Sequence, residues 1–395
     1  MNKLNIDKHT SKNFQLGNII TISFAHLVND VYSSFLSPLL PLLVKKYGIT
    51  LSLAGMLNLF QQIPALFQPF VGILSEKIPA RFLLIFAPSI TAISMSLLGT
   101  ANDYGALIII VIFAGVGSTL FHVPGSVMVK RISGERIGKG MSFFMLGGEL
   151  ARSLGPMLVL GAVEFWSLEE TYKLIPIGLT ATVLLFFRFR KIRITEELRK
   201  SKESISYFGV IKKHSGLFVQ IAGIFFFSAI MRGALSAFLP VYLVEKGNSL
   251  WFGGIALSVF QLSGAVGTFL SGTISDKIGR RNVLFLILAI SPVLMFVFVF
   301  SSGILSFALL VLMGLSMFGI TPVMLALINE IDSYHISFIN GVFMTINFLS
   351  GSFGILIVGF LGDLFSLTNA FTISPLIGIL ALPFIFMIKE NSKRK

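Results

Sequence analysis

Six ionisable side chains lie inside long apolar stretches of the sequence, where charge is rare. They are His26, Asp30, His122, Glu149, Arg152 and Arg232. A charged side chain at the centre of a bilayer costs about 2.5–3.5 kcal/mol on insertion scales, so such residues are easiest to explain when they line a water-filled cavity. Carboxylates and imidazoles can carry protons there, and guanidinium groups bind phosphate or carboxylate oxygens. These residue types therefore indicate proton exchange and anion binding.

The two carboxylates and the two imidazoles are the candidate proton carriers. Asp30 has no basic neighbour in its own apolar stretch except His26, so we expect it to be the more readily protonated carboxyl. We predict Asp30 as the leading carrier and Glu149 as the second, assisted by His26 and His122. Two alternatives stay open at this point. Asp30 is explained equally as a packing acid bonded to Asn29, and His122 as a hydrogen-bonded core residue.

The two arginines are the candidate anion-binding residues. Glu149 and Arg152 are three residues apart, so they share a helix face and either line the cavity or neutralise each other as a structural ion pair. Arg152 and Arg232 would offer fixed positive charge to a phosphonate, phosphate or carboxylate group. The other predicted substrate-binding residues are Asn29, Tyr32, Gln62, Gln261 and Asn347. Hydrogen bonding between helices explains the amides equally well.

The composition places these residues in a membrane protein. Of 395 residues, 54% are hydrophobic and only 12% are charged, about half the charge of a soluble chain. The absence of cysteine excludes a disulfide scaffold and thiolate metal sites. Continuous apolar runs without strict alternation favour helices over barrel strands. We predict an all-α integral membrane fold with spans at 16–44, 53–75, 82–101, 105–129, 140–163, 172–189, 217–244, 251–275, 283–302, 304–328, 339–361 and 370–388.

The distribution of Lys and Arg predicts the orientation of the chain. Most of the 31 basic residues fall in the segments that are cytoplasmic if both termini are inside the cell. The outer connections then contain only Lys45, Lys46, Lys173 and Lys246. This bias predicts a multi-pass protein of the bacterial cytoplasmic membrane with both termini in the cytoplasm. It also explains the net charge of +13 without a nucleic-acid partner.

An internal repeat divides the chain into two halves. The segment 41–48 (PLLVKKYG) matches 240–247 (PVYLVEKG) at an offset of 199, and 72–81 matches 272–281 at an offset of 200. Between them, the charged stretch 188–216 is the one credible linker. We predict an N-terminal six-helix bundle at 1–190, a cytoplasmic linker at 191–216 and a C-terminal six-helix bundle at 217–395. The halves are then parallel repeats with a substrate path at their interface.

The segment 272–281 (GTISDKIGRR) resembles the G-x-x-x-D-R/K-x-G-R/K-R/K signature of the major facilitators. The resemblance implies a conformational gate, in which the acid and the basic residues form contacts between the halves that break when the inner side opens. The residues concerned are Gly272, Asp276, Lys277, Arg280 and Arg281, and in the first, degenerate copy Glu76, Lys77 and Arg81. A simple topology signal is the alternative explanation.

Three segments of the N-terminal half resemble the fosmidomycin-resistance branch of that superfamily. They are 23–30 (SFAHLVND), 115–124 (GVGSTLFHVP) and 147–156 (GGELARSLGP). His26, Asn29, Asp30 and His122 match the pattern of the branch, whereas Glu149 and Arg152 depart from it. The third segment is also similar to part of the glycine–proline motif of proton-coupled antiporters. The resemblance implies a drug exporter of the inner membrane that exchanges its substrate for protons.

We therefore predict a proton-coupled exporter of a small amphiphilic or anionic compound, acting as a monomer by alternating access. No P-loop is present, so no direct use of ATP is supported. We expect no enzyme activity, cofactor or metal, and the expected partners are the substrate, protons and lipid. The alternatives are a transporter of an endogenous organic acid or sugar phosphate, and a non-transporting receptor or scaffold.

Overall fold

A computed structural model describes residues 14–68, 71, 80–134, 136–190, 207–329 and 336–388, and its described elements are all helical. The N-terminal half contains α1 (Leu16–Ser33), α2 (Leu36–Tyr47), α3 (Leu51–Gln62), η1 (Ile63–Phe67), α5 (Ala80–Ser96), η2 (Leu98–Thr100), α6 (Tyr104–Ile132), α7 (Ile137–Phe165), η3 (Glu169–Leu174) and α8 (Ile175–Phe189). The C-terminal half contains α9 (Tyr207–Lys213), α10 (Ser215–Gly233), η4 (Ala234–Phe238), α11 (Leu239–Glu245), α12 (Leu250–Ile278), α13 (Arg280–Val299), α14 (Ile304–Met317), α15 (Ile320–Asn329), α16 (Ile336–Phe365), α17 (Leu367–Gly378), η5 (Ile379–Ala381) and α18 (Leu382–Phe386).

The helices confirm the predicted all-α membrane fold. In the described part of the chain, 10 helical stretches are long and apolar enough to cross a membrane, and two shorter apolar ones are Leu51–Phe67 and Arg81–Ser96. Together they correspond to the predicted spans. Some spans consist of helices joined end to end, such as α1 with α2 in Leu16–Tyr47. The division near Ser302 is real, because Gly303 has a φ of +62° and separates α13 from α14.

Short polar side chains fix where several spans begin. Thr50 Oγ1 accepts a hydrogen bond from the Leu53 amide at the start of α3, and Asp103 Oδ1 accepts one from the Ala106 amide at the start of α6. Ser249 Oγ accepts a bond from the Phe252 amide at the start of α12. These caps satisfy amides that have no partner inside the helix. The chain therefore turns between spans at sequence-encoded positions.

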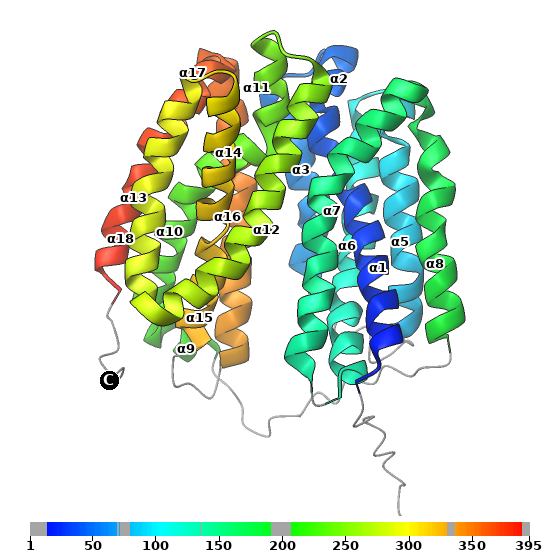
Figure 1. The fold of residues 1–395 in the computed structure, drawn as a ribbon, viewed down its shortest axis with the longest axis horizontal. Coiled ribbons are helices and arrows are strands. Elements are labelled where there is room, and N and C mark those ends of the chain that lie inside the picture. Colours follow the sequence, from blue (N-terminus) through cyan, green and yellow to red (C-terminus); the bar gives the residue numbers. More distant parts are fainter. Residues whose placement is uncertain are drawn as a thin grey trace, which may run out of the picture.

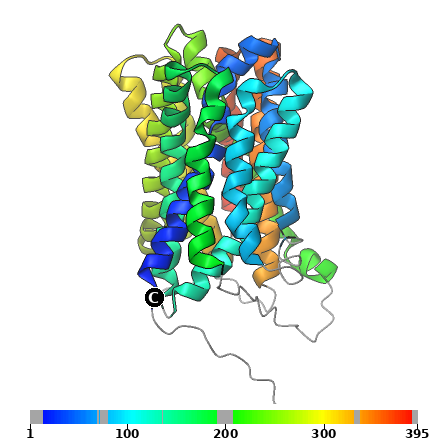
Figure 2. The same ribbon diagram turned by 90° about the vertical axis from the view of Figure 1, so that its right-hand side faces the viewer.

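Two groups of helices stand side by side in Figure 1, and Figure 2 shows the same arrangement turned by 90°. In the N-terminal half α1 packs against α5, α6, α7 and α8, and in the C-terminal half α10 packs against α16 and α17. Contacts between the halves join α3 to α16, α7 to α12 and α2 to α11. The halves meet near α2 and α11 and are more widely separated at the opposite end (Figure 1). Most of the predicted linker, 191–206, lies outside the described residues.

Candidate functional site

A cavity with polar and apolar walls lies between the two halves. It consists of two adjoining pockets of about 600 and about 470 Å³ that share lining residues from both halves, namely Gln62, Ala65, Gln68, Ser236, Phe348 and Ile355. The larger pocket contains Arg232 and Asn347, and the smaller contains Asp30, His122 and Arg152. Two of the predicted carriers and both predicted cations therefore meet at one interface, whereas His26 and Glu149 are not among the lining residues.

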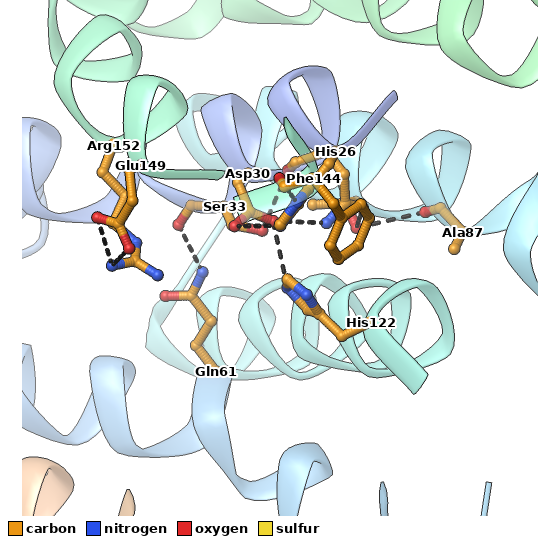
Figure 3. Close-up of polar contacts among 11 residues, drawn as sticks. His26, Asp30, Ser33, Gln61, Ala87, His122, Phe144, Glu149 and Arg152 are labelled. Atoms are coloured by element: carbon orange, nitrogen blue, oxygen red, sulfur yellow. Dashed lines mark hydrogen bonds and ion pairs between the residues drawn. The ribbon is translucent and has the colours of Figure 1, made fainter. Parts of the chain in front are cut away.

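Asp30 forms the centre of a three-residue group in the N-terminal half (Figure 3). His26, one turn earlier on α1, places Nε2 3.2 Å from Asp30 Oδ2. His122, on α6, places Nε2 3.3 Å from Asp30 Oδ1. Asp30 and His26 are buried, whereas His122 is half-buried and lines the cavity. Asp30 therefore has two imidazole neighbours, and the expectation that it lacks any basic neighbour except His26 holds for α1 alone and not for the fold.

Hydrogen bonds behind the group hold it in one orientation. His26 Nδ1 lies 2.7 Å from the Phe144 carbonyl oxygen, and because a carbonyl only accepts, Nδ1 carries the hydrogen. Nε2 therefore faces Asp30. Asn29 Nδ2 donates to Asp30 Oδ1 at 3.0 Å, and Thr91 Oγ1 on α5 donates to Asn29 Oδ1 at 3.0 Å. A proton that reaches Asp30 thus enters a preoriented network.

The α7 backbone closes one side of this group. A Cβ atom on Gly148 would lie 2.7 Å from His26 Nε2, closer than real Cβ contacts allow, and 3.3 Å from Asp30 Oδ2, which is a tight contact. A Cβ atom on the preceding Gly147 would lie 2.4 Å from the Ser23 carbonyl oxygen of α1. The glycine pair therefore lets α7 approach α1 beside His26 and Asp30. Any larger residue at 148 would displace the imidazole.

The same group is the place where a metal ion would fit. In the described part of the chain, His26, Asp30 and His122 offer ligand atoms within 4.8 Å of one another. Two nitrogens and one oxygen suit a divalent cation as well as a proton. Both imidazole Nε2 atoms already lie at ion-pair distance from the carboxylate, a geometry that a hydrogen on each of the two nitrogens also explains.

Glu149 and Arg152 form an ion pair on α7 (Figure 3). Arg152 Nη1 donates to both carboxylate oxygens, at 3.2 and 3.3 Å. The Arg152 side chain is 43% exposed and lines the cavity, whereas the Glu149 side chain is 14% exposed and is not among the lining residues. The geometry therefore favours the ion-pair explanation for Glu149 while leaving the guanidinium open to the cavity.

Arg232 has no such partner. It is half-buried on α10, and among the described residues it makes a single long hydrogen bond of 3.4 Å, to Asn347 Oδ1 on α16. Among the described residues no carboxylate lies within the 4.0 Å of an ion pair with it. An unpaired buried cation is costly. Its position on the cavity wall therefore indicates a site for an anion.

The predicted polar lining divides into two sets. Gln62, Gln261 and Asn347 line the cavity, and Gln261 Oε1 is a buried acceptor without a partner. Asn29 and Tyr32 do not line it: Asn29 is bonded to Asp30 and Thr91, and the buried Tyr32 hydroxyl donates to the Leu174 carbonyl oxygen at 2.5 Å. Substrate contact therefore stays a prediction for the first set, whereas the geometry gives Asn29 and Tyr32 internal hydrogen-bonding roles.

The C-terminal copy of the gate motif pairs within its own half. Asp276 Oδ1 lies 2.5 Å from Arg280 Nη2, and Arg280 also donates to the Gly272 carbonyl oxygen at 3.3 Å and to the Ser275 hydroxyl. Lys277 lies in the last turn of α12, and Arg281 lies over the ring of Phe386. In the first copy Arg81 lies over the ring of Phe82, while Glu76 and Lys77 lie outside the described residues. The gate role stays a prediction.

Thr91→Val tests whether the hydrogen bonds from Thr91 to Asn29 and from Asn29 to Asp30 hold the Asp30 carboxylate in its orientation. Valine keeps the shape of threonine but loses the hydroxyl that orients the Asn29 amide, so the amide can turn away from Asp30. We expect proton-driven transport to fall about 3- to 10-fold and its pH profile to shift, since a hydrogen bond to a charged group's partner is worth about 1 kcal/mol. Thr91→Ser should restore the profile. An unchanged pH profile in Thr91→Val would remove the role.

Comparisons with known proteins agree with this architecture. The chain matches the family model of the Major Facilitator Superfamily over residues 22–355. It is 27% identical to the fosmidomycin resistance protein of Escherichia coli (strain K12), over 97% of this chain and 96% of that protein. It is 24% identical to the MFS-type transporter YfnC of Bacillus subtilis (strain 168), over 95% of this chain and 93% of that protein.

Solved structures show the same fold. A bacterial homologue of the human lysosomal transporter Spinster, in an inward-facing and unoccupied conformation, superposes with a TM-score of 0.77 at 13% identity, covering 95% of this chain and 97% of that one. The family match spans most of the chain, and the helices that enclose the cavity are arranged as in a known transporter. The chain therefore belongs to the Major Facilitator Superfamily and is a multi-pass membrane transporter rather than an enzyme.

Proposed function

We propose that the chain is a proton-coupled exporter of a small amphiphilic or anionic compound. One observation carries the proposal: the titratable group of His26, Asp30 and His122 opens onto a cavity that also contains the arginines Arg152 and Arg232. Proton and anion sites thus share one space between the halves. The relative named as a fosmidomycin resistance protein supports export of a drug-like anion.

Alternating access would move this space from one side of the membrane to the other. The six-helix halves at 1–190 and 217–395 rock about the central site, and the 191–216 segment connects them. We place both termini in the cytoplasm of a bacterial cell, in the cytoplasmic membrane, because of the charge bias, and we expect one chain to form the whole path. The separated ends of the halves then face the cytoplasm, where an exporter collects its substrate.

Electrostatic competition between the proton and the anionic substrate does not by itself couple the His26–Asp30–His122 group to the anion site. An anion near the proton group favours its protonated form, so substrate and proton would not displace each other directly. A mechanical connection exists on α7, where Gly148 touches the proton group and Arg152, four residues later, lines the cavity. We infer that α7 shifts when the proton group changes its charge, and that this shift moves the guanidinium. Proton release and anion binding are thereby linked.

The lining of the cavity supports a second candidate substrate. Amides at 58, 61, 62, 68 and 261 and hydroxyls at 33, 34, 37, 118 and 236 surround the smaller pocket. Such a wall suits a hydroxylated anion, such as an organic acid or sugar phosphate, as well as a drug. The energy source and the path would be unchanged, and only the natural cargo would differ.

Flux through reconstituted protein tests the function. Proteoliposomes with a proton gradient should accumulate fosmidomycin on the acidic side, and its addition should move protons the opposite way. Liposomes without protein give the background, and glucose 6-phosphate tests the second candidate. Movement of the sugar phosphate alone would replace the drug with a metabolite. If neither compound moves protons although purified protein is folded, the exporter proposal fails in favour of a non-transporting receptor.

A further inference from the structure

We propose that Asp363 is a one-sided latch that holds the cavity shut at the end where the halves meet. Its carboxylate, on α16 of the C-terminal half, binds the first backbone amides of α3 in the N-terminal half. For the cavity to open at this end, that contact must break. The inference concerns the conformational equilibrium of the transporter and does not depend on which substrate or ion it carries.

The contact is a two-point hydrogen bond between the halves. Asp363 Oδ1 accepts from the Leu51 amide at 2.7 Å, and Oδ2 accepts from the Ser52 amide at 2.8 Å. These amides begin α3 and have no partner within that helix. Thr50 Oγ1 satisfies the next free amide, that of Leu53. A carboxylate at this position also meets the positive end of the helix dipole, so charge and geometry act together.

Two glycines bring α16 and α3 close enough for the contact. A Cβ atom on Gly359, one turn before Asp363, would lie 2.5 Å from the Leu51 carbonyl oxygen. A Cβ atom on Gly55 of α3 would lie 3.3 Å from the Ile355 carbonyl oxygen of α16. The helices thus touch through their backbones over about one turn on each side. The short aspartate side chain then reaches the amides without strain.

The internal repeat supplies a natural comparison. At the offset of 199, Thr50 corresponds to Ser249, Gly55 to Gly254 and Asp363 to Glu164. The corresponding helices, α7 and α12, also pack against each other. Yet Glu164 is exposed and, among the described residues, makes no hydrogen bond to α12, where Ser249 caps the Phe252 amide. In the described residues the carboxylate contact therefore occurs at the α3–α16 interface and has no counterpart at Glu164.

A single difference in size explains the asymmetry. The position that corresponds to Gly359 is Leu160, and its Cδ1 atom fills the space where a Cβ on Gly254 would stand, at 2.2 Å. A leucine side chain separates α7 from α12, whereas α16 and α3 meet through glycine. The acid on α7 is therefore held away from the amides of α12. The latch therefore occurs at the α3–α16 interface, where the two helix backbones touch.

Cysteine accessibility tests the latch directly, since the chain has no cysteine of its own. Ser37→Cys reports on the cavity wall at α2, and Met344→Cys reports on the wall of the larger pocket at α16. A membrane-impermeant maleimide is applied to intact cells for the first and to inside-out vesicles for the second. Asp363→Asn should raise outer labelling of the first reporter at least about fivefold and lower inner labelling of the second.

Glu164→Gln is the matched control, because it removes the corresponding carboxylate at the interface without the contact. It should leave both labelling rates unchanged. The proposal is overturned if Asp363→Asn labels like the parent protein, or if Glu164→Gln opens the outer side equally. Loss of folding is recognised separately, because it would raise both labelling rates together instead of moving them in opposite directions. Failure of the exporter proposal would not change these rates.

Discussion

Asp30→Asn is expected to abolish uphill, proton-driven transport while exchange of substrate across the membrane stays measurable. Asparagine keeps the shape of the side chain but lacks the charge that lies between His26 and His122. It neither binds nor releases a proton, so the coupling step is lost, and we expect uphill flux to fall by about two orders of magnitude. Counterflow in proteoliposomes without a proton gradient measures the exchange that remains.

Glu149→Gln serves as the comparison for this prediction. Glu149 pairs with Arg152 and is not among the cavity-lining residues, so uphill flux should persist at a reduced level. If Asp30→Asn transports uphill at nearly the parental rate, Asp30 is not the carrier. If Glu149→Gln loses uphill flux instead, the roles that we give to the two carboxylates are reversed. A loss of both uphill flux and exchange in Asp30→Asn would indicate a structural role.

Arg232→Ala is expected to weaken binding of anionic compounds about 10- to 100-fold and to leave neutral compounds nearly unaffected. Hydrogen bonds to charged groups contribute about 1.5–3 kcal/mol, which corresponds to this range. Because Arg232 has no described acidic partner, its removal leaves no carboxylate unpaired. Thermal stabilisation of the purified protein by fosmidomycin, compared with a neutral analogue, measures the effect.

Two further variants distinguish charge from packing at this site. Arg232→Lys keeps the cation and should retain most of the preference for anions, although a single ammonium cannot copy the planar guanidinium. Arg152→Ala leaves Glu149 unpaired and should lower the melting temperature more than Arg232→Ala does. Equal weakening of neutral and anionic compounds by Arg232→Ala would remove its role in anion recognition.

The sequence predicts the spans well because a helix that crosses the membrane needs a continuous run of apolar residues. It also singles out Asp30 and Arg232 as candidates, because charge is rare in such surroundings, and both line the cavity. It does not show that His122 reaches Asp30 from another helix, because no pattern records a contact between positions so far apart. The local reading of α1 therefore gives Asp30 one imidazole neighbour, where the fold gives it two.

Other parts of the site cannot be predicted from the types of the residues that form them. The Phe144 carbonyl that orients His26 belongs to the backbone, which is the same at every position. Thr91 resembles many hydroxyl residues of membrane helices, and its role emerges only from its bond to Asn29. Gly148 lies in a predicted glycine-rich motif, yet its contact with the imidazole depends on how α7 crosses α1. The orientation of Tyr32 toward the Leu174 carbonyl likewise depends on how the helices pack and is not visible in the sequence.

The leucine that separates α7 from α12 also has a consequence for the route of the cargo. Backbone contacts such as those of Gly55 and Gly359 cannot yield without moving whole helices, whereas Leu160 can change its rotamer in place. We therefore expect the interface beside Leu160 to yield before the interface beside α3, which separates only after the Asp363 contact breaks. The space that then opens between α7 and α12 would depend on one aliphatic side chain.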